Sequence, residues 1–192
     1  MGMPAAAHPW TAEEVRALPD DGNRYELISG ELVVTLSPRG VHQVAVFELS
    51  WRIRSWLEST DAGHVLGSPA DLSLGEDEVL QPDLFVYRTA SGKPLRDWSD
   101  ITTLALVIEV LSPSTARHDR QLKRRRYQRA RIPEYWIVDL DSRLIERWQA
   151  DDERPEILQE RLIWQPEPGA EAFDLDLASL FAELWGDERS VH

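Results

Sequence analysis

Residues 104–111 form an almost continuous apolar run with the length of one β-strand. A run of this kind is typical of a central strand that is covered on both faces, as in α/β proteins. Glu109 is the only polar side chain in the run. Because burying a carboxylate costs several kcal/mol unless it is paired, hydrogen-bonded or bound to a metal, Glu109 is a candidate functional residue.

The remaining segments alternate between helical and strand patterns. Residues 41–59 have apolar side chains at three- and four-residue spacing, which predicts an amphipathic helix. Residues 25–28 and 31–36 predict two strands around a tight turn. Other helices are expected over residues 11–18, 116–130 and 176–185, and other strands over 64–66, 70–74, 79–87, 135–139, 144–149 and 157–164. This order predicts one α/β domain, residues 1–192, with a central mixed sheet.

The charge of the chain is unevenly distributed. Its 34 acidic and 21 basic side chains give a formal net charge of −13, which argues against a protein coated in positive charge for nucleic acid or anionic membrane. Residues 117–131, however, hold eight basic side chains and one acidic side chain, a net charge of +7. Such a segment is either a solvated helix face or a contact surface for phosphates.

Two absences narrow the class of protein. The sequence has no cysteine, which excludes disulfides, thiolate metal sites and a cysteine nucleophile. It has no apolar run of about 18 residues and no secretory signal pattern. We therefore expect a soluble, cytoplasmic protein without a membrane partner.

Asp83 is a second acidic residue in apolar surroundings, within the strand-like residues 79–87 and directly after Pro82. Aspartate is rare in strand interiors, and a preceding proline suggests the start or the edge of a strand. For Asp83 and for Glu109, the alternative to a functional role is a strand-end carboxylate that caps a turn or pairs with an arginine.

Lys123 is one of only two lysines in a chain whose other basic residues are arginines. At 100° per residue, Ala116, Lys123 and Ala130 share one face of the expected helix, with Tyr127 beside them. This face is the one that should pack on the sheet. The alternative is an i,i+4 pair with Asp119 in which the lysine stem turns outward to solvent.

Two buried carboxylates and one inward lysine indicate a specific chemistry. Hard oxygen ligands without cysteine suit Mg²⁺ or Mn²⁺. An ion held by Asp83 and Glu109 near Lys123 would lower the pKa of a bound water and stabilise a pentavalent phosphorus centre. The pattern therefore predicts metal-dependent hydrolysis of phosphodiesters.

Five motifs follow one another along the chain: RYELISGEL at residues 24–32, QPD at 81–83, EVLSPST at 109–115, the spacing of Asp119, Arg120, Lys123 and Tyr127, and PEYWIVD at 133–139. Together they resemble the Uma-type family of putative restriction endonucleases, a bacterial family in the PD-(D/E)xK nuclease superfamily. The resemblance covers about residues 10–150, and the tail is also similar.

The resemblance implies a restriction-endonuclease-like core, α-β-β-β-α-β, over about residues 24–150, with residues 151–192 as a C-terminal extension. It implies that Asp83 and Glu109 bind Mg²⁺ or Mn²⁺, with the Val110 carbonyl as a further ligand. The residue two positions after Glu109, where the superfamily motif has its lysine, is Leu111. The resemblance implies that the lysine has moved to the following helix, as Lys123.

Three further residues are candidates for accessory roles. Glu31 is either an additional acidic ligand or an exposed hairpin residue. His42 matches a position near the family's site, but at the first turn of an amphipathic helix it is also a candidate core histidine. Tyr127 is a packing residue that could position Lys123. We interpret Asp139, at a strand end, as structural.

The expected function is a Mg²⁺-dependent DNA endonuclease with Asp83, Glu109 and Lys123 as catalytic residues. Its expected contacts to DNA phosphates are Arg117, Arg120, Arg124 and Arg125. The alternative is a catalytically silent module that uses the nuclease fold to bind DNA or a protein partner, favoured by the net charge and by the absence of a separate sequence-reading domain. The arginine-rich helix is also a candidate homodimer interface, facing the acidic C-terminal part of another copy.

Overall fold

A computed structural model describes residues 9–35, 39–75, 78–90, 94–113, 115–169 and 171–187. Leu36, expected as the last residue of a strand, lies outside these ranges. Within them, no helix is both long and apolar enough to cross a membrane.

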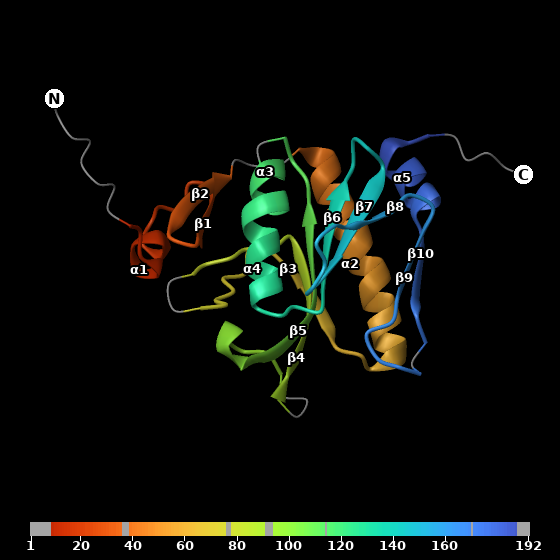
Figure 1. Cartoon of the computed structure of the whole chain (residues 1–192), viewed down its shortest axis with the longest axis horizontal. Coiled ribbons are helices and arrows are strands. Elements are labelled where there is room, and N and C mark those ends of the chain that lie inside the picture. The colour runs from red at the N-terminus through yellow and green to blue at the C-terminus, as the bar shows by residue number, and fades with distance from the viewer. Residues whose placement is uncertain are drawn as a thin grey trace, which may run out of the picture.

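A six-stranded mixed sheet with the order β3-β4-β5-β6-β7-β8 forms the centre of the molecule (Figure 1). Its strands are β3 (His64–Gly67), β4 (Leu84–Thr89), β5 (Ile101–Val110), β6 (Glu134–Asp139), β7 (Leu144–Gln149) and β8 (Glu156–Leu158). The β5–β6 pair is parallel and the other pairs are antiparallel. The apolar run thus lies in a strand with neighbours on both sides, and the prediction of a central mixed sheet is confirmed.

Helices cover both faces of this sheet (Figure 1). Helices α2 (Gly40–Thr60) and α5 (Leu177–Trp185) pack with the even-numbered side chains of the central strands, such as Ile108 and Trp136. The opposite face receives α3 (Ala116–His118), the π-helical segment η3 (Asp119–Lys123) and α4 (Arg124–Arg129). Because side chains alternate along a strand, Glu109 points toward this second layer, from which Lys123 comes.

A β-hairpin lies beside the central sheet. Strands β1 (Arg24–Ile28) and β2 (Glu31–Thr35) form a two-stranded sheet, and α1 (Ala12–Arg16) packs on them. The hairpin is joined to the rest of the molecule by an isolated bridge between Leu27 and Val79. This bridge brings β1 next to the segment that leads into β4.

The C-terminal extension packs into the main core. Strands β9 (Arg161–Trp164) and β10 (Phe173–Asp176) form a second two-stranded sheet. The buried ring of Trp164 lies 5.3 Å from that of Trp56 on α2 and 5.6 Å from that of Trp136 on β6. The described part of the extension, residues 151–169 and 171–187, therefore shares a core with the central sheet.

Three expectations about strands were wrong. Residues 157–164 form two strands in different sheets, since β8 ends at Leu158 and β9, which pairs with the unpredicted β10, starts at Arg161. Residues 70–74 form no strand and contribute a single bridge at Leu72. The strand expected over residues 79–87 starts only at Leu84, after Pro82, which has no backbone N–H to donate to a ladder.

One short 3₁₀ helix, η2 (Trp98–Asp100), precedes β5, and the helix expected over residues 116–130 is present with a π-helical turn inside it. A π-helical turn is rare and changes the direction in which the following side chains point. Here it ends at Lys123.

Candidate active site

Asp83 lies directly before β4 and is 4% exposed. Its Oδ1 accepts a hydrogen bond from Arg24 Nη1 at 2.9 Å, and its Oδ2 accepts one from the Val110 backbone N–H at 2.8 Å. The same Oδ2 lies 3.1 Å from His42 Nε2. Asp83 therefore connects the start of β4 to the end of β5 and to the first turn of α2.

The backbone around Asp83 is fixed by the end of β3. Ser68 Oγ donates to the Pro82 carbonyl at 2.6 Å, and the Ser68 N–H donates to the Asp83 carbonyl at 3.3 Å. A Cβ atom at Gly67 would lie 2.7 Å from the Asp83 carbonyl oxygen, so this close approach requires glycine. The position of the carboxylate is thus set by backbone contacts as well as by its own hydrogen bonds.

Glu109 is 2% exposed and faces the α3–α4 layer. Its Oε1 accepts hydrogen bonds from Lys123 Nζ at 2.9 Å and from Tyr127 OH at 3.2 Å. Tyr127 is itself buried. The contact explains how a carboxylate is tolerated in the middle of an apolar strand.

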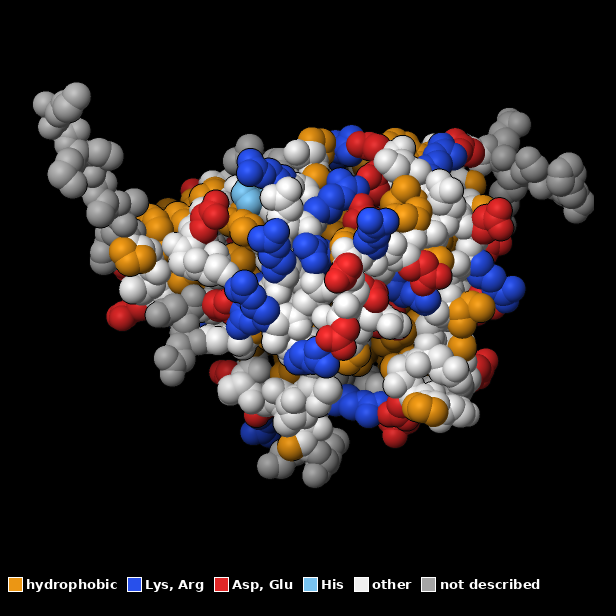
Figure 2. All heavy atoms as spheres, viewed as in Figure 1, with side chains coloured by type: hydrophobic (Ala, Val, Ile, Leu, Met, Phe, Trp, Pro, Cys, Tyr) orange, Lys and Arg blue, Asp and Glu red, His pale blue; other side chains and the backbone are white. Residues whose placement is uncertain are grey.

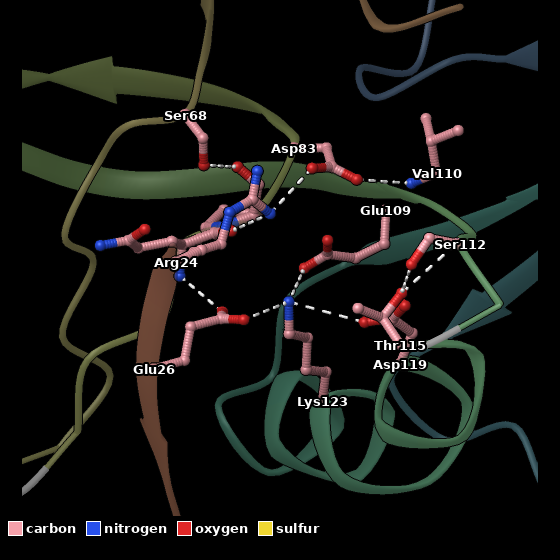
Figure 3. A network of polar contacts seen from close by, with 12 residues as sticks. Arg24, Glu26, Ser68, Asp83, Glu109, Val110, Ser112, Thr115, Asp119 and Lys123 are labelled. Atoms are coloured by element: carbon pink, nitrogen blue, oxygen red, sulfur yellow. Dashed lines mark hydrogen bonds and ion pairs between the residues drawn. The ribbon is translucent and has the colours of Figure 1, made fainter. Parts of the chain in front are cut away.

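Lys123 is 2% exposed, and three carboxylates surround its ammonium group (Figure 3). Nζ lies 2.9 Å from Glu26, 2.9 Å from Glu109 and 3.5 Å from Asp119. The i,i+4 pair with Asp119 is therefore present, but the lysine stem turns into the protein and not outward to solvent. This orientation agrees with the face assigned to Lys123 from helical geometry.

Three members of this cluster were not predicted as site residues from the sequence. Glu26 on β1 is 1% exposed, Asp119 is 1% exposed, and Arg24 reaches Asp83 from the start of β1. Arg24 and Glu26 belong to the RYELISGEL motif, but no role was assigned to them. The signal that could have identified Glu26 is its strand position, because it shares a face with the buried Ile28 two residues later.

The three accessory candidates, Glu31, His42 and Tyr127, do not all lie in the cluster. His42 is buried and lines the same cavity as Asp83, with its Nδ1 making no hydrogen bond to the described residues. Tyr127 contacts Glu109 as described above. Glu31 is exposed at the start of β2 and is not brought into the cluster. Asp139, interpreted as structural, pairs with Arg120 and accepts a hydrogen bond from the Ser142 N–H.

The electrostatics of Asp83 and Glu109 differ. Burial alone would raise the pKa of Asp83, but the hydrogen bond from His42 and the charge of Arg24 outweigh it and hold the pKa well below its usual range. For Glu109, burial raises the pKa well above its usual range, although Lys123 opposes the rise. Burial lowers the pKa of Lys123, but Glu109, Glu26 and Asp119 overcome this effect and raise it. Asp83 thus stays ionised, whereas Glu109 takes up a proton more readily than an ordinary glutamate.

These side chains line a cavity of about 280 Å³. Its lining includes Asp83, Glu109, Val110, Asp119 and Lys123 together with Arg24 and His42. The uncharged polar residues that also line it are Asn23, Thr35, Gln43, Ser68, Ser112 and Thr115, among others. Arg24 and Lys123 are its only Lys or Arg side chains among the described residues. A ligand that enters the cavity would therefore meet both cations and the carboxylates together.

The donor set suits a divalent cation. Asp83, Glu109 and the Val110 carbonyl supply the hard oxygen atoms that Mg²⁺ and Mn²⁺ prefer. Negative charge is in excess, since Asp119 and Glu26 add two carboxylates to a cluster with only two permanent cations. Asp119 Oδ1 is buried without a hydrogen bond to the described residues. In the same residues, however, no group of three or more His, Asp or Glu side chains has the geometry of a complete metal site.

The arginines proposed to contact nucleic acid fall into two groups. Arg117 and Arg125 are exposed on the outer side of the α3–α4 layer. Arg120 is bound to Asp139 at 2.9 Å and to Glu146 at 2.6 Å, and Arg124 lies 4.5 Å from the centre of the Trp148 ring. Figure 2 shows Lys and Arg side chains gathered over this layer, with acidic groups beside them.

Comparison with known proteins places this arrangement in a family. The Uma2 family, described as "Putative restriction endonuclease", matches residues 12–178. The chain belongs to the Uma2 family. The match contains β1, Asp83, Glu109 and Lys123, so all the charged members of the cluster lie inside the Uma2 region.

A solved structure supports the fold assignment. The chain is similar to a crystal structure described as a putative nuclease belonging to DUF820 from Anabaena variabilis ATCC 29413, with a TM-score of 0.70 and 21% sequence identity. The similarity covers 92% of this chain and 99% of that chain. It confirms the expected nuclease-type α/β fold for this Uma2 protein. No curated protein matches the chain.

Proposed function

We propose that this Uma2 protein is a metal-dependent endonuclease that hydrolyses phosphodiester bonds in DNA. In this proposal Asp83, Glu109 and the Val110 carbonyl hold Mg²⁺ or Mn²⁺, and Lys123 is the catalytic lysine. The observation that carries the proposal is the buried Lys123 ammonium 2.9 Å from Glu109, in a cavity that Asp83 also lines. A cavity that contains one lysine and two carboxylates offers both positive and negative charge to a phosphodiester bound in it.

Each side chain has a role that follows from its surroundings. Asp83 stays ionised because His42 and Arg24 stabilise its charge, so it can act as a permanent anionic ligand. Lys123 can donate hydrogen bonds to a phosphate oxygen or to the attacking water, and its charge opposes the negative charge that develops at phosphorus. The bound metal would polarise the phosphate and lower the pKa of a water. Both oxygens of Asp83 already have a partner, but Oδ1 accepts only one hydrogen bond and so retains a lone pair for the metal.

The expected contact surface for DNA includes the exposed Arg117 and Arg125. Arg120 and Arg124 would join it only by leaving the carboxylates and the indole ring that they now contact. With a net charge of −13 for the whole chain, we expect binding that is weak, sensitive to salt and confined to this face. A homodimer and a cytoplasmic location remain predictions.

The proposal is tested by incubating the protein with plasmid DNA and Mg²⁺ or Mn²⁺. Wild-type protein should cleave, and Asp83→Ala should not. Asp141→Ala is a matched control, because Asp141 is an exposed aspartate that contacts only Arg39 among the described residues, and it should cleave like wild type. Cleavage that survives Asp83→Ala would eliminate the proposed mechanism.

The second candidate function is a catalytically silent module that binds DNA or a protein partner. It is favoured by the absence, within the described part of the chain, of a complete metal-ligand group, and by the hydrogen bonds that both Asp83 oxygens already accept. This candidate predicts no calorimetric signal for Mn²⁺ at Asp83 and Glu109. Binding of Mn²⁺ that is lost in Asp83→Ala would count against it.

A further inference from the structure

Two charged side chains of β1 lie in the site, although β1 belongs to a separate two-stranded sheet. Arg24 and Glu26 are two residues apart and therefore share one face of the strand. That face is turned toward Asp83 and Lys123 (Figure 3). The hairpin therefore lies outside the central sheet but directly contacts Asp83 and Lys123.

Glu26 connects Lys123 to a fixed point of the backbone. Its Oε2 lies 2.9 Å from Lys123 Nζ, and its Oε1 accepts a hydrogen bond from the Gln81 N–H at 2.8 Å. Both carboxylate oxygens are therefore used, each by a different donor. Because a lysine side chain is long and flexible, an anchor of this kind restricts where the ammonium group can lie.

Arg24 makes the complementary connection to Asp83. One nitrogen, Nη1, donates to the Gln81 carbonyl at 3.1 Å and to Asp83 Oδ1 at 2.9 Å. The N–H and the carbonyl of Gln81 are thus both bound by β1 side chains. Lys123 and Asp83 come from different parts of the fold. Through Glu26 and Arg24, both are connected to the backbone of Gln81.

Apolar contacts already attach the hairpin to the protein. Leu27 and Val79 pack with Ala12 and Val15, and the backbone groups of Leu27 and Val79 exchange hydrogen bonds of 2.9 and 3.1 Å. A buried charged network is seldom needed for stability, because well-packed apolar residues often serve as well. The charged side chains on β1 are therefore better explained by their contacts with Lys123 and Asp83 than by a need to attach the strand to the protein.

We propose that β1 is the positioning strand of the active site, in which Glu26 positions Lys123 and Arg24 positions Asp83. This inference rests on the proposed nuclease function. Neither residue needs to touch the substrate. If Glu109 gave up its contact with Lys123 to hold a cation, the contact with Glu26 would still hold the lysine in place.

The test compares Glu26→Gln with wild type. Glutamine keeps the shape and can still accept a hydrogen bond from the Gln81 N–H, but it has only one carbonyl oxygen and no charge to offer Lys123. Since a misplacement of about 1 Å can lower a rate about 100-fold, kcat for cleavage should fall about 10- to 100-fold, with KM within about 2-fold of wild type. Glu31→Gln, an exposed glutamate on the adjacent strand, is the matched control and should leave both constants unchanged. An unchanged kcat in Glu26→Gln would overturn the proposal.

A second readout separates this inference from the nuclease function itself. The chain has two lysines, so protein labelled with ¹⁵N at lysine side chains has two possible ammonium signals. The buried Lys123 should give a signal protected from exchange, assigned by its loss in Lys123→Met. Glu26→Gln should shift this signal and Glu31→Gln should not. If the signal shifts but wild type cleaves nothing, the nuclease proposal fails and the positioning contact stands; if it does not shift, the positioning role is refuted.

A second variant covers the case in which Glu26→Gln does not fold. Glu26→Asp retains the charge, but it is one methylene shorter and cannot reach Lys123 and the Gln81 N–H together. It should also shift the Lys123 signal and lower kcat. Wild-type values for both would overturn the proposal.

Discussion

Replacing Lys123 by Met removes the ammonium group from a pocket in which Glu26, Glu109 and Asp119 converge on it. Methionine fills nearly the same volume, so the loss is mainly electrostatic. Removing one partner of a buried ion pair costs about 3–5 kcal/mol, because the remaining charge stays buried without compensation. For a domain of this size, Tm falls by about 2–4 °C for each kcal/mol of stability lost. The expected fall in Tm is therefore about 6–20 °C.

Urea denaturation followed by the fluorescence of the eight tryptophans measures this loss. The loss should be largest near neutral pH. Without the lysine, the pKa values of Glu109 and Asp119 in the folded state rise further above their unfolded values, since burial already raises both. The variant should therefore regain stability as the pH falls and these groups take up protons. Equal stability of Lys123→Met and wild type near neutral pH would refute the reasoning, as would a loss that does not depend on pH.

Other perturbations address the metal, the DNA contacts and the core. Binding of Mn²⁺, measured by calorimetry, should weaken as the pH falls, starting above the usual range for glutamate because burial raises the pKa of Glu109; a pH-independent affinity would contradict this. Arg125→Ala should weaken binding to DNA of any sequence and reduce the slope of log K against log salt by about 1 in anisotropy titrations, since Arg125 is exposed; an unchanged slope would remove it from the interface. Trp164→Ala should lower the free energy of unfolding by about 3–5 kcal/mol, because its ring is buried against Trp56 and Trp136; a loss below about 1 kcal/mol would mean that the extension adds little to the core.

The inward orientation of Glu109 and Lys123 could be predicted from their neighbours. Glu109 interrupts an apolar run, and Lys123 interrupts a face of small and aromatic residues in a chain that otherwise uses arginine. In both cases a local pattern carries the information: the eight-residue run 104–111 for Glu109, and the helix face over residues 116–130 for Lys123. The 2.9 Å contact between the two groups was not predicted, because it depends on how the helix docks on the sheet.

Glu26 could not be found in the same way. Arg24 and Glu26 alternate with Tyr25 and Leu27, which is the ordinary pattern of a hairpin with one face in solvent. The polar face is instead buried because β1 packs beside Gln81, a residue 55 positions away from Glu26. Contacts of this range depend on the whole fold, and the apolar Ile28 on the same face of β1 is the one local sign that Glu26 is buried.

The burial of Asp119 could not be predicted from its neighbours in the sequence. It lies among arginines, and i,i+4 geometry in a regular helix suggested a surface pair with Lys123. The π-helical turn and the docking of the helix on the sheet bury both residues. The division of residues 157–164 between two sheets was likewise beyond local patterns, because it depends on which partner each half finds.

The most direct test of the proposed site separates metal binding from turnover at Lys123. Wild type and Lys123→Met are compared, both confirmed to be folded, in Mn²⁺ calorimetry and in single-turnover cleavage of plasmid DNA. If Lys123 acts on the phosphate or the water while Asp83 and Glu109 hold the metal, the variant should bind Mn²⁺ at least as tightly as wild type, because a nearby positive charge is lost. Its cleavage rate should fall about 100-fold or more. Cleavage by the variant within a few-fold of wild type would contradict the assignment of Lys123 as the catalytic lysine.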